Sequence, residues 1–131
     1  MLRRYMDAVE RADLDTVAAL LAEDVRTSMP PWPMWFRGRD AVVAALASSW
    51  DPAAPHYVGR FKVLPVRANA QPAAAAFLRR PGDTVHHAFA VSVLQIEDGL
   101  VVEATAFHDT GLFPAFGLPM TLPAALAPPD R

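Results

Sequence analysis

The histidines are the residues of this sequence best suited to proton transfer, because an imidazole gains or loses a proton near neutral pH. His108 closes the last extended segment of the chain and is the leading candidate for acid–base chemistry. The adjacent pair His86 and His87 could indicate a metal site, but neighbouring strand residues face opposite sides of a sheet. Since no third ligand stands at a suitable spacing, we expect no bound metal.

Motifs for several other chemistries are absent from the sequence. It contains no cysteine, no glycine-rich phosphate loop, no nucleophile elbow and no Cys/His zinc pattern. These absences argue against nucleotide hydrolysis, serine hydrolysis and zinc chemistry. The sequence offers no pattern for a redox cofactor either, so we expect a domain that works without cofactors.

An aromatic and proline-rich stretch, Ser28 to Gly38, lies between two helical segments and is the second candidate for function. Its prolines remove backbone donors, which excludes a central strand or a helix interior. Large rings are costly to leave in water, so Trp32, Trp35 and Phe36 should face a core, a cavity or a partner. A rigid aromatic wall suits an apolar ligand, and packing in the core is the alternative.

Composition indicates one domain without disulfides. The chain has 131 residues, no cysteine and a net charge of −2, and this length is sufficient for one core. The arginines form short, separated groups rather than a basic face, so we expect no direct nucleic-acid partner. Charges occur throughout residues 1–24 and no later apolar run approaches about 18 residues, which argues against a leader or a membrane span. We expect a cytoplasmic protein with a domain at 1–121 and a loose tail at 122–131.

Apolar residues at spacings of three and four predict three helices in the first half of the chain. The first helix spans roughly residues 1–12, and the second runs from a cap at Asp13 or Asp15 to about residues 23–24. A short strand at 25–29 follows. The third helix spans about 38–51, where Pro52 prevents its continuation.

The apolar period then changes to two, which predicts four long strands joined by turns. They cover residues 56–66, 73–80, 85–96 and 100–108. Helices followed by such a meander predict an α+β fold, in which three N-terminal helices pack against a curved, cone-shaped antiparallel sheet. The segment 110–119 is too rich in glycine and proline for a strand, and we expect it to cover the open end of the cone as a lid.

Several segments resemble the opening of the SnoaL-like, ketosteroid-isomerase-like branch of the nuclear-transport-factor-2-like superfamily, whose fold is a cystatin-like α+β roll. They are Arg4-Tyr-Met, Ala12-Asp-Leu-Asp, Ala22-Glu-Asp and Phe36-Arg-Gly-Arg-Asp-Ala. The stretch 29–38 together with the ending 107–119 is similar to the C-terminal domain of actinobacterial extracytoplasmic-function sigma factors. The resemblance implies a domain that modulates transcription, with sigma-factor core domains or RNA polymerase as partners where it is fused to them.

The resemblance also allows a comparison with the catalytic groups of ketosteroid isomerase, a carboxylate base with a tyrosine and a neutral carboxylic acid as oxyanion donors. Tyr5 matches the tyrosine, but Met29 takes the place of the base and Ser92 that of the second donor. Methionine cannot accept a proton, so isomerisation by that mechanism is not expected. SnoaL-like cyclases place an acid–base aspartate just before a Gly-Leu-Leu stretch. Asp109 precedes a similar Gly-Leu-Phe stretch, but it stands one residue closer to the glycine than the cyclase aspartate does. An Asx-turn is the alternative role for Asp109.

The alignment further directs Ala104, Ala106 and His108 into the cone, where two small residues leave room for a ligand beneath the imidazole. A core histidine bonded to a carbonyl or to Tyr5 is the alternative for His108. On the preceding strand, strict alternation places one set inside, namely His86, Ala88, Ala90, Ser92 and Leu94. It places the other set outside, namely His87, Phe89, Val91 and Val93.

These observations favour a small-molecule-binding or interaction domain that regulates an extracytoplasmic-function sigma factor. We expect a small apolar or aromatic ligand in a pocket lined by Tyr5, Met29, Trp32, Trp35, Phe36, Trp50, His86, Ser92, His108 and Phe113. The alternative is a cofactor-independent isomerase, cyclase or other proton-transfer lyase, natural or engineered, with His108, Asp109 and Tyr5 as catalytic residues. Apolar residues on the outer sheet face, including Val91, Val93 and Phe107, predict a homodimer.

Overall fold

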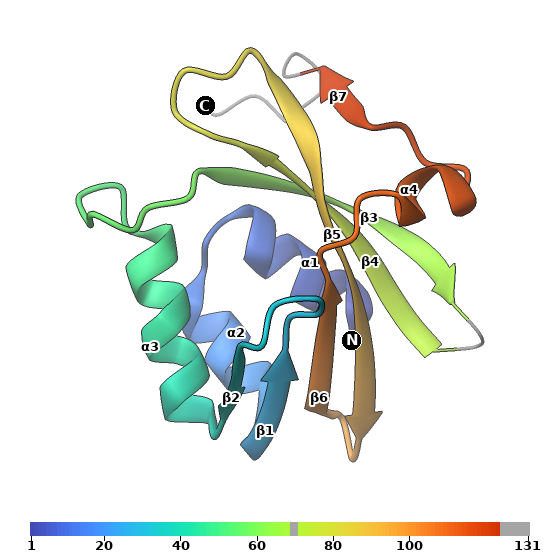
Figure 1. Ribbon diagram of the computed structural model, residues 1–131. Coiled ribbons are helices and arrows are strands. Elements are labelled where there is room, and N and C mark those ends of the chain that lie inside the picture. The colour runs from blue at the N-terminus through green and yellow to red at the C-terminus, as the bar shows by residue number, and fades with distance from the viewer. Residues whose placement is uncertain (69–70, 124–131) are drawn as a thin grey trace.

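The computed structural model describes residues 1–68 and 71–123 and forms an open curved sheet with helices against it (Figure 1). In chain order the elements are α1 (Leu2–Glu10), α2 (Leu14–Leu20), β1 (Leu21–Ser28), β2 (Trp35–Arg37), α3 (Arg39–Trp50), β3 (Arg60–Ala68), β4 (Gln71–Arg79), β5 (Val85–Glu97), β6 (Leu100–Phe107), α4 (Leu112–Ala115) and β7 (Thr121–Pro123). The predicted α+β class, with N-terminal helices packed on a curved sheet, is confirmed.

The second helix begins where predicted but ends earlier. Asp13 caps α2, because its carboxylate accepts hydrogen bonds from the Thr16 backbone N at 3.2 Å and from the Thr16 hydroxyl at 2.7 Å. The helix ends at Leu20, whereas the apolar spacing predicts an end near residues 23–24. From Leu21 onward the backbone pairs with β6, so sheet hydrogen bonds override the helical preference of these residues.

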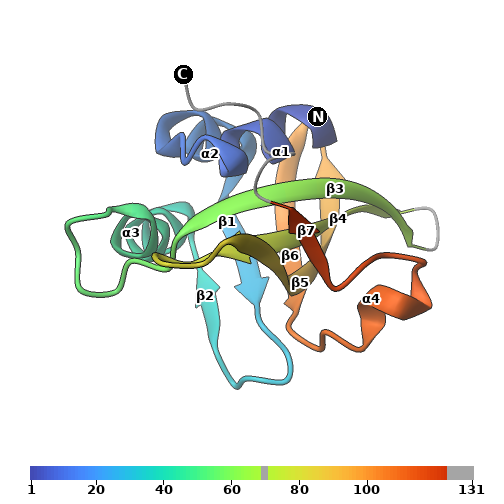
Figure 2. The ribbon, with the colours of Figure 1, turned by 90° about the horizontal axis from the view of Figure 1, so that it is seen from above.

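The main sheet has the strand order β2-β1-β6-β5-β4-β3, and β7 pairs with β5 beside this path. β1 lies parallel to β6, and the other pairs are antiparallel. Helices α1 and α2 lie on one side of the sheet, and α4 lies on the other (Figure 2). We call the first side, which α3 also covers, the inner face and the second the outer face.

The sequence analysis did not predict two short strands. The three residues of β2 pair with β1 at one edge, and the three residues of β7 pair with Val85 to His87 of β5. Leu122 and Pro123 therefore belong to the sheet, although we expected the loose tail to begin at 122. The remaining tail, 124–131, and the predicted turn residues 69–70 lie outside the described residues.

A β-bulge in β5 reverses the alternation of the strand. Ala76 of β4 pairs with Ala90, but the next β4 residue, Phe77, pairs with Ala88, which leaves Phe89 as an extra residue. Strict alternation through this strand was therefore the wrong expectation for residues 86–89. Phe89 faces inward beside Ala90, and the residues before it change sides.

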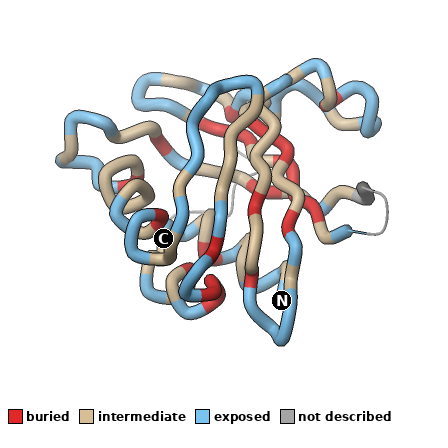
Figure 3. The backbone as a smooth tube through the Cα atoms, turned by 60° about the horizontal axis from the view of Figure 1, so that its bottom comes forward, coloured by how far each residue is buried: buried red, intermediate tan, exposed pale blue. Residues whose placement is uncertain are grey.

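One cluster of buried apolar side chains packs on each face of the sheet. The inner cluster has nine buried members, namely Ala8, Val17, Leu21, Val25, Val42, Trp50, Leu94, Val101 and Ala104 (Figure 3). The outer cluster is built from Ala75, Phe77, Val91 and Phe113. The Phe113 ring lies edge-on to Phe77, with ring centroids 5.1 Å apart. α4 is thus anchored on the outer face, and the expected lid over the cone is wrong because Phe113 is buried on the opposite side of the sheet.

We predict that Phe113→Ala lowers the free energy of unfolding by about 3–5 kcal/mol, because it leaves a cavity in the outer cluster. Phe116→Ala, on the same short helix but 39% exposed, should lower it by less than about 1 kcal/mol. Chemical denaturation of both variants measures the difference. Equal losses would contradict the anchoring role of Phe113.

Candidate functional site

A cavity of about 230 Å³ lies between α1, α3 and the inner face of the sheet. Tyr5 and Val9 of α1 and the buried stripe of α3 form one wall, and the strands form the other. The residues that line it are Tyr5, Val9, Thr27, Ser28, Met29, Phe36, Val42, Ala45, Leu46, Ser49, Trp50, Val58, Phe61, Ala76, Phe89, Ala90, Ser92, Ala104, Ala106 and His108. Most of them are apolar, so the cavity suits an apolar molecule.

His108 lies at the end of β6, where its backbone N donates to the Pro30 carbonyl oxygen at 2.8 Å. Its ring stands edge-on to Phe89, with ring centroids 4.8 Å apart. Burial lowers the pKa of His108, because the apolar surroundings disfavour the charged imidazolium. The ring therefore favours the neutral form, which offers one donor and one acceptor to the cavity.

Tyr5 enters the same cavity from α1. Burial raises the pKa of Tyr5, so its hydroxyl stays protonated at neutral pH and can donate a hydrogen bond. Within the described residues, neither this hydroxyl nor the His108 ring has a hydrogen-bond partner. Both groups are thus available to a molecule in the cavity.

The cavity contains six of the residues that the sequence singled out for the pocket, namely Tyr5, Met29, Phe36, Trp50, Ser92 and His108. Sequence reasoning missed several polar and aromatic neighbours. Thr27 and Ser28 belong to β1 and lie within the strand predicted at 25–29, and Ser49 shares the inner side of α3 with Trp50. Phe89 was assigned to the outer face, since the bulge gives no clear sequence signal.

Trp32 and Trp35 lie outside the cavity, contrary to expectation. Their side chains are 59% and 69% exposed. Trp32 belongs to the connection from β1 to β2, which projects beyond the sheet (Figure 2), and Trp35 is the first residue of β2. Because β2 is a three-residue edge strand, no element covers the aromatic rings at its start.

His86 and Phe113 also lie outside the cavity. Phe113 packs in the outer cluster. His86 pairs with Leu122 of β7, and cross-strand partners share a face. Since Leu122 packs against the outer cluster, the bulge at Phe89 has moved His86 to the outer face.

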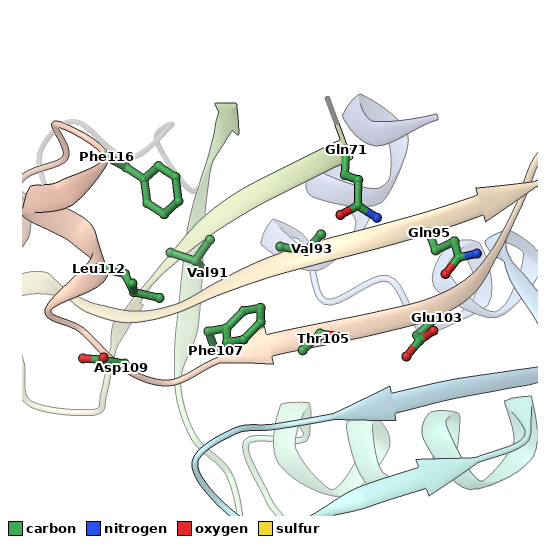
Figure 4. Close-up of a pocket in the computed structure, with 10 residues that line it drawn as sticks. All are labelled: Gln71, Val91, Val93, Gln95, Glu103, Thr105, Phe107, Asp109, Leu112 and Phe116. Atoms are coloured by element: carbon green, nitrogen blue, oxygen red, sulfur yellow. The ribbon is translucent and has the colours of Figure 1, made fainter. Parts of the chain in front are cut away.

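Asp109 is separated from His108 by the sheet. It lines a broad hollow of about 590 Å³ on the outer face, beside Phe107 and Leu112 (Figure 4). One oxygen of its carboxylate accepts a hydrogen bond from the Gly111 backbone N at 3.0 Å. This is the Asx-turn that the sequence offered as the alternative, so Asp109 does not join His108 and Tyr5.

The cavity therefore contains one titratable base. None of its described lining residues is an aspartate or glutamate, and a carboxylate base of the ketosteroid isomerase kind is not assembled there. No cluster of three metal-ligating side chains occurs among residues 1–68 and 71–123. In the same part of the chain, every helix is too short or too polar to cross a membrane.

Comparison with known proteins finds one family model, the SnoaL-like domain, which matches residues 2–104. The chain is 37% identical over 122 residues to the ECF RNA polymerase sigma factor SigG of Mycobacterium tuberculosis. That match covers 93% of this chain and 32% of the sigma factor, so the chain spans about a third of the length of this relative.

Solved structures share the fold. A Kribbella flavida protein described as a candidate ketosteroid isomerase is 26% identical, with a TM-score of 0.62 over 98% of this chain and 79% of that one. An NTF2-like protein of unknown function from Burkholderia xenovorans is 16% identical, with a TM-score of 0.65 over 99% of this chain and 91% of that one. At that identity the second match shows the fold alone.

The half-buried His108 predicts a specific dependence of stability on pH. Its pKa is lower in the folded state than in the unfolded chain, where it is about 6.5. Its contribution to stability is therefore complete above that pH and falls as the pH drops below it, because the unfolded state binds the proton more readily.

Relative to His108→Gln, the wild type should lose free energy of unfolding between about pH 7.5 and pH 5.5. Denaturant titrations at both pH values measure this, and His56→Gln, at an exposed position, controls for the loss of an imidazole. A wild-type advantage that stays constant across this range would contradict the assigned environment of His108.

Proposed function

This chain belongs to the SnoaL-like domain family, as its sequence predicted, and on that premise we propose that it is a small-molecule-binding regulatory domain. Its ligand would be a small apolar or aromatic molecule held in the inner cavity. The observation that carries the proposal is an apolar cavity in which two polar groups, Tyr5 and His108, have no partner within the described residues.

The size and chemistry of the cavity support this class of ligand. Its 230 Å³ lies just below the range of roughly 300–1,000 Å³ typical of ligand sites, which suits a molecule with a single ring. The ring would contact Phe36, Trp50 and Phe61, and a polar substituent would reach Tyr5 or His108. Ala104 and Ala106 leave space beneath the imidazole.

Similarity to SigG supports the regulatory part of the proposal. Sigma-factor core domains or RNA polymerase would be the partners where such a domain is joined to them, and a cytoplasmic location belongs to the same proposal. Direct contact with nucleic acid does not, because the arginines form short, separated groups along the sequence. A homodimer also belongs to the proposal, since Val91, Val93 and Phe107 line the open hollow of the outer face.

The connection between β1 and β2 provides a physical route from the cavity to a partner. Met29 lines the cavity, its N donates to the Met34 carbonyl oxygen at 3.1 Å, and its carbonyl oxygen accepts from the Trp32 N at 2.9 Å. The next residue, Pro30, accepts the hydrogen bond from His108. A ligand that displaces Met29 or His108 would therefore move the exposed Trp32, and occupancy would favour one position of this segment.

An enzyme remains the second candidate because of the neutral His108 and the protonated Tyr5 in one cavity. His108 could accept a proton from the carbon next to a carbonyl group, while the electron pair moves to the carbonyl oxygen. Tyr5 would donate a hydrogen bond to that oxygen, and His108 would return the proton to carbon. Asp109, on the outer face, takes no part in this scheme.

The binding proposal predicts that fluorobenzene and 4-fluorophenol bind in the cavity, as observed by ¹⁹F NMR. Ala106→Trp places an indole in the cavity and should weaken binding at least about tenfold, since a packed site cannot hold both groups. Thr105→Trp adds the same bulk on the outer face and is the matched control. Unchanged binding in Ala106→Trp, or no binding to the wild type, would refute the assignment of the cavity.

The enzyme alternative predicts exchange of the methyl protons of 4-fluoroacetophenone in deuterium oxide, followed by ¹H NMR. His108→Ala should slow the exchange at least about a hundredfold, because the base is lost. His87→Ala, at a half-exposed imidazole outside the cavity, should leave the rate unchanged. Exchange that is equally fast in His108→Ala, or absent from the wild type, would remove this alternative.

A further inference from the structure

The outer face carries a row of basic side chains that neither the cavity nor the comparisons explain. Arg60 of β3 pairs with Arg79 of β4. The pairing of Leu78 with His87 in β4 and β5 places His86 beside Arg79 in the same register, and His86 pairs in turn with Leu122 of β7. Since cross-strand partners share a face, the basic row runs across β3, β4 and β5 and ends beside Leu122 of β7.

Two buried nitrogen atoms in this row lack partners. His86 is 2% exposed, and it is the one buried polar or charged residue of the described chain. Within the described residues, its Nδ1 and the Nε of Arg79 have no hydrogen-bond partner. Buried polar atoms are rarely left unpaired, because each costs about 1–3 kcal/mol. The pair therefore calls for an acceptor between or beside the two nitrogens.

Among the described residues, the carboxylate that acts on His86 is that of Glu10, which already has partners. Lys62 and Glu10 form an ion pair at 3.6 Å, and the same Glu10 oxygen accepts the Val63 backbone N at 2.7 Å. β7 contributes no charged residue. Burial, followed by the charges of Arg79 and Lys62, lowers the pKa of His86; Glu10 opposes them, and Arg60 adds a smaller lowering effect. Positive potential therefore dominates around His86.

We propose that His86 and Arg79 form a binding site for a small oxyanion, a carboxylate or a phosphate group, on the outer face beside β7. Both nitrogens are donors when His86 carries its proton on Nδ1, and the guanidinium provides the opposite charge. Arg79 is half-buried, whereas His86 is buried. The site is separated from the inner cavity by the sheet and is independent of the ligand proposed there.

The test uses two probes, sulfate for the tetrahedral anion and acetate for the carboxylate, at constant ionic strength adjusted with chloride. ¹⁵N NMR of the imidazole nitrogens reports directly on His86. At least one probe should shift the His86 Nδ1 resonance with a saturating curve, and the stronger binder identifies the class of oxyanion. Sulfate should bind more tightly at pH 6 than at pH 8, because a protonated His86 adds charge to the site.

Neighbouring residues provide matched controls. Arg79→Gln should weaken anion binding at least about tenfold, since a hydrogen bond from a charged donor is lost. Arg80→Gln removes the same charge from an adjacent exposed residue and should change the affinity less than about twofold. Arg79→Lys keeps the charge but removes Nε, and should also weaken binding.

His86→Asn and His87→Asn form the second matched pair, because these two residues lie on opposite faces of β5. Loss of the saturating shift in His86→Asn but not in His87→Asn would support the site. Shifts of the wild-type His86 nitrogens that never saturate would overturn the proposal. Equal weakening by Arg79→Gln and Arg80→Gln would also overturn it, since that result indicates general attraction by surface charge.

Discussion

The β-bulge at Phe89 determines how this small domain uses its sheet. β5 is the longest strand, with 13 residues, and it pairs with β4, β6 and β7 along different parts of its length. Without the extra residue, His86 would face the cavity and Phe89 the outer surface. The bulge instead puts an aromatic ring beside His108 and a buried imidazole on the outer face beside β7. The chemical character of both faces depends on this one irregularity.

The inner face combines an apolar cavity with few polar groups, and this combination explains the electrostatics of His108 and Tyr5. Removal from water favours the neutral form of each, so the cavity holds two uncharged hydrogen-bonding groups against aromatic walls. Such a site suits recognition of a weakly polar molecule more than stabilisation of a developing charge, because it contains no carboxylate. The similarity to a sigma factor adds a regulatory context to that chemistry.

Residue patterns predicted the α+β fold because helical and strand periods separate cleanly along the chain, and Asp13 and Pro52 mark helix ends. Ser92 and His108 line the cavity as predicted because the pairing of β5 with β6 is regular from Val91 to Gln95, and Met29 and Phe36 also line it. Prediction failed where tertiary pairing or an inserted residue decided the outcome. β1 takes residues 21–24 from the second helix, and Phe113 is buried by Phe77, which is distant in sequence. The exposure of Trp32 and Trp35 depends on how far the β1–β2 connection projects beyond the sheet. Residue composition does not predict that distance.

We propose that the exposed β1–β2 connection changes position when a molecule binds in the cavity. ¹⁵N–¹H NMR of the three tryptophan indoles, recorded while 4-fluorophenol is added, tests it most directly. We expect the indole resonances of Trp50, in the cavity wall, and of Trp32, in the exposed connection, to shift along one saturating curve. A shift of Trp50 without Trp32 would contradict the coupling, and a linear shift of the exposed indoles alone would contradict binding in the cavity.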